Sequence, residues 1–145
     1  MTTRTPQRDK QQTRSPWLLP GRLLIAAVFL AGAVFNFFVT LRAPAVELGR
    51  LIDLSPLPFI QELASCIAIP YATIFVILII LFEVSIATSV LLGVRVRRCA
   101  YIASLLFFLV LAPLIGWYAV SNLIWALPAL ILLHYDKPET NRRAA

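Results

Sequence analysis

One apolar run, residues 71–93, constrains the fold of this chain more than any other feature, because it contains a single acidic or basic residue, Glu83. A helix needs about 20 predominantly apolar residues to cross the hydrocarbon core of a bilayer, so this run predicts a membrane-spanning helix. Glu83 lies near the middle of the run and is expected at mid-membrane. A carboxylate there costs roughly 2.5–3.5 kcal/mol to insert, so it must be paired, protonated or turned towards the interior of a bundle.

Other apolar runs follow the same pattern. The chain is 60% hydrophobic and 14% charged, whereas a soluble domain is about 45–50% apolar and roughly 25% charged. The surplus is gathered in runs, which is typical of a membrane protein. The expected spans are about 17–41, 71–93, 100–117 and 121–135. The sequence therefore predicts an all-α integral membrane four-helix bundle over residues 16–135.

The segment between the first two spans is too polar and too rich in proline to cross the bilayer. We expect two short amphipathic helices here, over residues 45–54 and 57–69, lying on the membrane surface or covering the bundle. A packed lid and a docking site for an external partner both remain open. After the second span, residues 94–99 are expected to form a tight basic turn.

The distribution of basic residues predicts the orientation. Of the 13 lysine and arginine residues, only Arg42 and Arg50 fall in the loop between the first and second spans. The others lie beside the termini or in the turn after the second span, so the positive-inside rule predicts an inner-membrane protein with both termini in the cytoplasm. Residues 1–15 and 136–145 are expected to be polar cytoplasmic tails, the first of them disordered. The net charge of +6 does not build a basic face, so no nucleic-acid partner is expected.

Glu83 is the centre of the candidate binding site. Arg22, in the first span, is either an interfacial residue or the counter-ion of Glu83. The second alternative is open because the expected depths of the two residues differ by about 8 Å, a distance that an extended arginine side chain nearly spans. Asn36 and Ser85 complete the candidate internal polar site. An intramembrane acid suits a proton relay, a hydrogen bond to a quinone or coupled transport. The alternative is a buried glutamate that only fixes helix packing.

Aromatic residues near the ends of the spans indicate an interfacial belt. Its expected members are Trp17, Tyr71, Trp117 and Tyr118. Two cysteines, Cys66 and Cys99, are predicted on opposite sides of the bilayer, which excludes a disulfide between them. No metal-ligand spacing or catalytic triad is recognisable, so no metal and no catalytic residue are predicted.

The chain resembles the DoxX family and its DoxX-like relatives. The resemblance depends on Arg22 and Gly32 in the first span and on Glu83, Gly93, Arg98 and Ala100 in and after the second. Two positions depart from the family pattern. Asn36 stands where a basic residue is common, and Ala87 stands where glycine is common. The first departure weakens the expectation of a charged pair at a redox site.

The resemblance implies a four-span fold and an association with membrane redox complexes. Our first hypothesis is a small subunit, not an enzyme by itself, of a redox or quinone-linked complex, in which Glu83 lines an internal polar site with Arg22 as a candidate partner. No cofactor is predicted, and a quinone is the one candidate ligand. The second is an assembly or structural partner of another membrane protein, which binds through the external segment 42–70. The third is a small proton-coupled transporter. Besides the lipid bilayer and a membrane-protein partner, homo-oligomerisation remains open.

Overall fold

The computed structural model describes residues 18–115 and 118–136, and within these ranges the chain is helical and has no strands. The elements are α1 (Leu18–Phe38), η1 (Thr40–Arg42), α2 (Pro44–Asp53), α3 (Pro58–Ala68), α4 (Ala72–Ser89), α5 (Val94–Ile115) and α6 (Tyr118–Tyr135). The predicted all-α class is confirmed. The tail predicted over residues 1–15 lies outside the described residues, as do residues 137–145 of the second tail.

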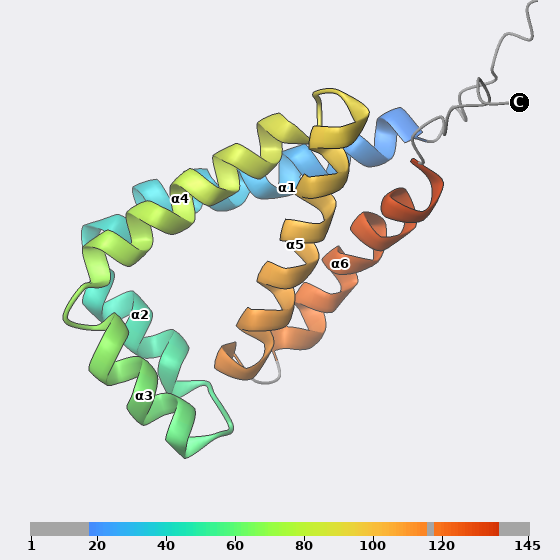
Figure 1. Cartoon of the computed structure of the whole chain (residues 1–145). Coiled ribbons are helices and arrows are strands. Elements are labelled where there is room, and N and C mark those ends of the chain that lie inside the picture. The colour runs from blue at the N-terminus through green and yellow to red at the C-terminus, as the bar shows by residue number, and fades with distance from the viewer. Residues whose placement is uncertain (1–17, 116–117, 137–145) are drawn as a thin grey trace, which may run out of the picture.

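The helices form two arms that diverge from a common end (Figure 1). One arm is α1 packed along α4, which runs in the opposite direction, and the other is the hairpin of α5 and α6. Where the arms meet, a compact apolar core joins them. Its members include Phe29 of α1, Val90 after α4, Tyr101 of α5 and Leu132 of α6. At the opposite end, α2 and α3 lie side by side beyond the α1–α4 arm, and α2 contacts both α4 and α5.

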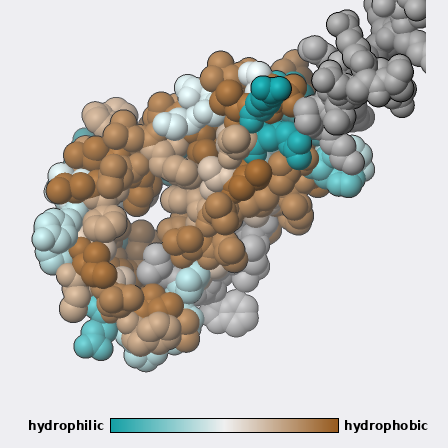
Figure 2. All heavy atoms as spheres, in the orientation of Figure 1, coloured by the Kyte–Doolittle hydropathy of each residue, from teal (hydrophilic) through white to brown (hydrophobic). Residues whose placement is uncertain are grey.

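The outer surface of the arms is strongly apolar. Figure 2 shows hydrophobic residues over most of one face, with hydrophilic residues gathered near two ends. Three stretches of described helix are long and apolar enough to cross a membrane, namely Leu18–Arg42, Ala72–Ser89 and Val94–Pro113. The chain is therefore compatible with a multi-pass membrane protein. A shorter apolar stretch, Ile124–Tyr135, lies in α6, and the crossing of the membrane by this fourth helix stays a prediction.

The two short helices expected between the first two spans are present as α2 and α3. Each has proline in its first turn, where the missing N–H is not needed for an intrahelical bond. The connection between them is tied to α5, because the Ser55 hydroxyl donates a hydrogen bond to the Pro113 carbonyl at 2.7 Å. The segment therefore covers the end of the α5–α6 arm as well as the end of α4.

The basic turn predicted over residues 94–99 is wrong. The chain turns at residues 90–93, and the basic residues lie in the first two turns of α5. Valine and arginine are compatible with a helix, so the break comes earlier, at the Leu92–Gly93 step. Arg97 reinforces this break, because its Nη2 donates to the Leu92 carbonyl at 2.6 Å. The third apolar helix therefore begins six residues before the predicted start at residue 100.

Candidate functional site

A chain of three polar side chains lies between α1 and α4. The Thr40 hydroxyl donates to Asn36 Oδ1 at 2.9 Å, and Asn36 Nδ2 donates to Glu83 Oε2, also at 2.9 Å. Glu83 is 7% exposed and Thr40 is 5% exposed. Both bonds point towards the glutamate, so the chain ends on its carboxyl group. Asn36 binds Oε2, and the other oxygen, Oε1, accepts no hydrogen bond from the described residues.

Gly32 makes room for that oxygen. A Cβ atom built on Gly32 would lie 2.5 Å from Glu83 Oε1, closer than such atoms approach in proteins. The carboxyl group therefore packs directly against the backbone of α1. Gly32, Asn36 and Thr40 follow one another at intervals of four residues, which places them along one face of the helix and its continuation.

The same face borders a cavity of about 300 Å³ between the two arms. Glu83, Asn36, Thr40 and Gly32 line one side, and the remaining lining residues are apolar. Four of these are aromatic, namely Phe29, Phe107, Phe108 and Trp125. Leu48 and Leu51 of α2 contribute from the external segment. Figure 2 shows the molecule hollowed between the α1–α4 arm and α5. The cavity is thus apolar with one polar wall, as is usual for sites that bind small organic molecules.

The aromatic residues also separate the cavity from the packed core. Phe29 contacts Phe108 with ring centroids 5.7 Å apart, and Phe82 contacts Phe107 at 4.9 Å. Edge and tilted contacts of this kind add to the apolar burial of the rings. The site therefore has one rigid wall of stacked rings, and Glu83 follows Phe82 directly in α4.

The pairing of Arg22 with Glu83 that the sequence suggested is wrong. Arg22 Nη2 instead forms a salt bridge with Asp136 Oδ1 at 3.1 Å, and Asp136 Oδ2 is bound by Arg97 Nη1 at 2.7 Å. Arg22 lies in the second turn of α1, whereas Glu83 packs more than two turns further along this helix, opposite Gly32. The first part of α1 contacts the end of α6, so the nearest acid is Asp136.

Ser85 also lies apart from the other candidate site residues. Its hydroxyl donates to the Leu81 carbonyl of its own helix at 2.6 Å, and the residue is exposed. Thr88 does the same with the Val84 carbonyl. Back-bonding of this kind is common for hydroxyls in membrane helices. The structure therefore brings together Glu83 and Asn36 among the predicted site residues and adds Thr40 and Gly32.

Two residues that the structure shows in polar contacts, Thr40 at the site and Asp136 beside Arg22, are not among the predicted site residues, although each leaves a signal in the sequence. Thr40 follows Asn36 by four residues, the spacing at which side chains on a helix meet. Asp136 comes directly after the last apolar run, at the end where basic residues gather. An acid at the end of a helix, beside several cations at one membrane surface, is a natural partner for them.

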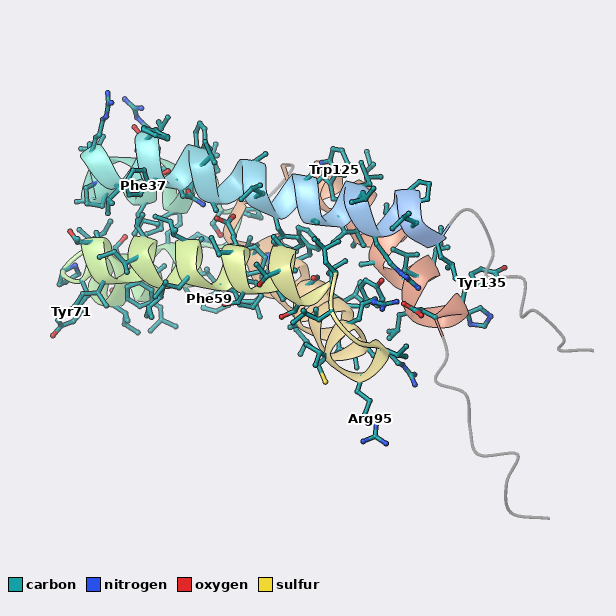
Figure 3. The ribbon with its side chains drawn as sticks, turned by 90° about the horizontal axis from the view of Figure 1, so that it is seen from above. Phe37, Phe59, Tyr71, Arg95, Trp125 and Tyr135 are labelled. Carbon is teal, nitrogen blue, oxygen red and sulfur yellow. The ribbon has the colours of Figure 1, made fainter. Side chains whose placement is uncertain are left out.

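Of the expected aromatic belt, only one side chain is described. Tyr71 is 60% exposed and lies at the end opposite to Tyr135 (Figure 3). Trp17 and Trp117 lie outside the described residues, and Tyr118 begins α6, although its side chain is not described. Cys66 and Cys99 are both exposed and free. In the described part of the chain, no three histidine, cysteine, aspartate or glutamate residues are placed to hold a metal ion.

No family model, curated protein or solved structure matches this chain. The described residues form an all-helical protein, compatible with several membrane crossings, with a partly polar cavity between two helical arms. The resemblance to the DoxX family remains a hypothesis.

Proposed function

We propose that the cavity binds a lipid-soluble molecule whose polar head is hydrogen-bonded by Glu83, and that a quinone is this ligand. The observation that carries the proposal is that Glu83 is among the few polar residues that line an otherwise apolar and aromatic cavity. A quinone combines a flat ring, which suits an aromatic wall, with oxygens that accept a hydrogen bond in the oxidised form and donate one in the reduced quinol form. In this view the protein is a DoxX-like, non-catalytic subunit of a redox or quinone-linked membrane complex.

The proposed setting is the inner membrane, with both termini in the cytoplasm. The salt bridge between Arg22 and Asp136 holds the beginning of α1 and the end of α6 at the same end of the molecule. Arg97 joins them, and Arg95 extends from this end away from the bundle (Figure 3). This common basic end supports the orientation expected from the positive-inside rule.

Glu83→Gln tests the proposal. We expect affinity for a short-chain ubiquinol analogue to fall about tenfold, because glutamine keeps the side-chain shape but replaces the charged carboxylate, which accepts a hydrogen bond from a quinol hydroxyl, with a neutral amide. A hydrogen bond to a charged group contributes about 1.5–3 kcal/mol, and tenfold corresponds to about 1.4 kcal/mol. Quenching of tryptophan fluorescence in nanodiscs measures the binding, with Trp125 on the cavity wall as a reporter.

Ser85→Ala is the matched control, because Ser85 lies on the same helix but bonds only to its own backbone. It should leave the affinity unchanged. If Glu83→Gln binds the analogue as tightly as the natural protein, the quinone proposal is wrong. A Ser85→Ala variant that weakens binding equally would contradict the placement of the ligand on this wall.

A second function, assembly with another membrane protein, is favoured by the surface of α3. No residue of this helix is buried, and Phe59, Leu63 and Ile67 are all at least half exposed. Their spacing of four residues places them on one face. Such a face suits either a protein partner or the surface of the bilayer.

We expect the double change Phe59→Ser and Leu63→Ser to reduce a co-purifying membrane protein at least tenfold in mild detergent, because it removes two apolar anchors from this face. Quantitative mass spectrometry of the purified complex measures the loss. Glu62→Gln, on the same helix and also exposed, is the control and should retain the partner. If the double variant retains every partner, the assembly proposal is wrong, and the apolar face of α3 lies on the membrane instead.

A further inference from the structure

A buried group of charged and polar side chains lies where α1, α5 and α6 meet, apart from the cavity. Asp136 bridges the two arginines, receiving Arg22 on Oδ1 and Arg97 on Oδ2. Tyr101 is fully buried beside them, close enough for its hydroxyl to interact electrostatically with all three. We call these four residues the basic cluster.

The basic cluster has more donors than acceptors. Both carboxylate oxygens of Asp136 are used, and Arg97 directs Nε and Nη2 to the Leu92 carbonyl. Arg22 Nε and the Tyr101 hydroxyl are buried, and neither has a hydrogen-bond partner among the described residues. A buried donor without a partner costs about 1–3 kcal/mol. The two donors belong to neighbouring side chains, and an acceptor that reaches both would complete their hydrogen bonding.

The charge of the basic cluster points to an anion. Two guanidinium groups face one carboxylate, which leaves one positive charge in excess. The side chain of Arg22 is 17% exposed, compared with 10% for Arg97 and 6% for Asp136, so Arg22 is the least buried of the three charged side chains. Guanidinium groups bind phosphate oxygens through parallel N–H bonds, and basic pockets between membrane helices take phosphate head groups.

We propose that the basic cluster binds a phosphate group, with Arg22 Nε and the Tyr101 hydroxyl as donors and Arg97 as a supporting charge. The basic cluster lies where α1 and α5 begin and α6 ends. Both α1 and α5 are long and apolar enough to cross a membrane, and α6 contains a shorter apolar stretch. The ends of these helices are therefore expected at the depth of the lipid head groups. A phosphate there is supplied either by an anionic phospholipid or by free phosphate. This site is independent of the cavity and of the function proposed for it.

The test compares the apparent Tm of the full chain in nanodiscs of phosphatidylcholine, of phosphatidylcholine with phosphatidylglycerol, and of phosphatidylcholine with added inorganic phosphate. We expect phosphatidylglycerol to raise the Tm by about 4 °C through preferential binding to the folded state. A rise with inorganic phosphate alone identifies the free anion as the source. No rise with either source overturns the proposal.

Tyr101→Phe separates binding from folding. It removes an unpaired buried hydroxyl, so its Tm in phosphatidylcholine should equal or exceed that of the natural protein, whereas the phosphate-dependent rise should disappear. Arg22→Lys, which keeps the charge but not the Nε donor, should also lose the rise and is the second variant if Tyr101→Phe does not fold. Arg95→Gln, at the same end but exposed, should keep it. A full rise in Tyr101→Phe, or an equal loss in Arg95→Gln, would show general attraction to charged lipid instead.

Discussion

Asp136→Asn is expected to lower the free energy of unfolding by about 3–5 kcal/mol, the usual result of breaking a buried ion pair from one side. The carboxylate is 6% exposed and is the shared partner of two arginine side chains. Without its charge, two guanidinium groups remain in the buried basic cluster with no counter-ion among the described residues. Equilibrium unfolding in mixed micelles, followed by helical circular dichroism, measures the change.

Glu47→Gln is the control for this experiment. Glu47 pairs with Arg50 at 2.9 Å, but the Arg50 side chain is 71% exposed, so this pair is screened by water. Exposed pairs contribute about 0–1 kcal/mol. A loss in Asp136→Asn no larger than that in Glu47→Gln would mean that the basic cluster does not hold the two arms together.

Gly32→Ala is expected to weaken ligand binding in the cavity more than tenfold and to destabilise the fold by about 1–3 kcal/mol. The new methyl group would lie 2.5 Å from Glu83 Oε1, so the carboxyl group must turn away and release Asn36. Helix propensity alone predicts the opposite sign, because alanine in a helix is favoured over glycine by roughly 0.5–1 kcal/mol. The quenching and unfolding measurements described above report both effects.

Gly93→Ala provides the comparison, because nothing lies within 4 Å of the position that its methyl group would take. It should change neither affinity nor stability appreciably. A Gly32→Ala variant that is more stable than the natural protein and binds equally well would show that Glu83 is not held against α1.

The helices and their order were predictable because their signals are local. Long apolar runs and early prolines determine where helices start and stop, and the predicted surface helices at 45–54 and 57–69 correspond closely to α2 and α3. The start of α5 differs from the prediction, because a run of basic residues, which suggests a turn, is also compatible with the end of a helix at a membrane surface. The polar group of Glu83 and Asn36 was predicted as part of one site, but the cavity beside it depends on how two arms diverge.

The errors at the site have geometric causes. Ser85 is two residues from Glu83, and side chains at that separation point to nearly opposite faces of a helix, so their association was excluded by the helix itself. The partner of Arg22 depends on where α6 ends relative to α1, which is a long-range contact. No local pattern encodes it. The acid that Arg22 binds is separated from it by 114 positions in the chain.

Because the two arms diverge, the molecule is narrow at one end, where the arms are held together, and wide at the other. The basic cluster and apolar core fasten the narrow end, whereas the wide end is bridged by α2 and by the bond from Ser55 to Pro113. In a bilayer, the lateral pressure of the acyl chains would act mainly on the wide end. The volume enclosed there would then follow bilayer thickness and chain packing, so the lipid composition itself becomes a means of tuning occupancy.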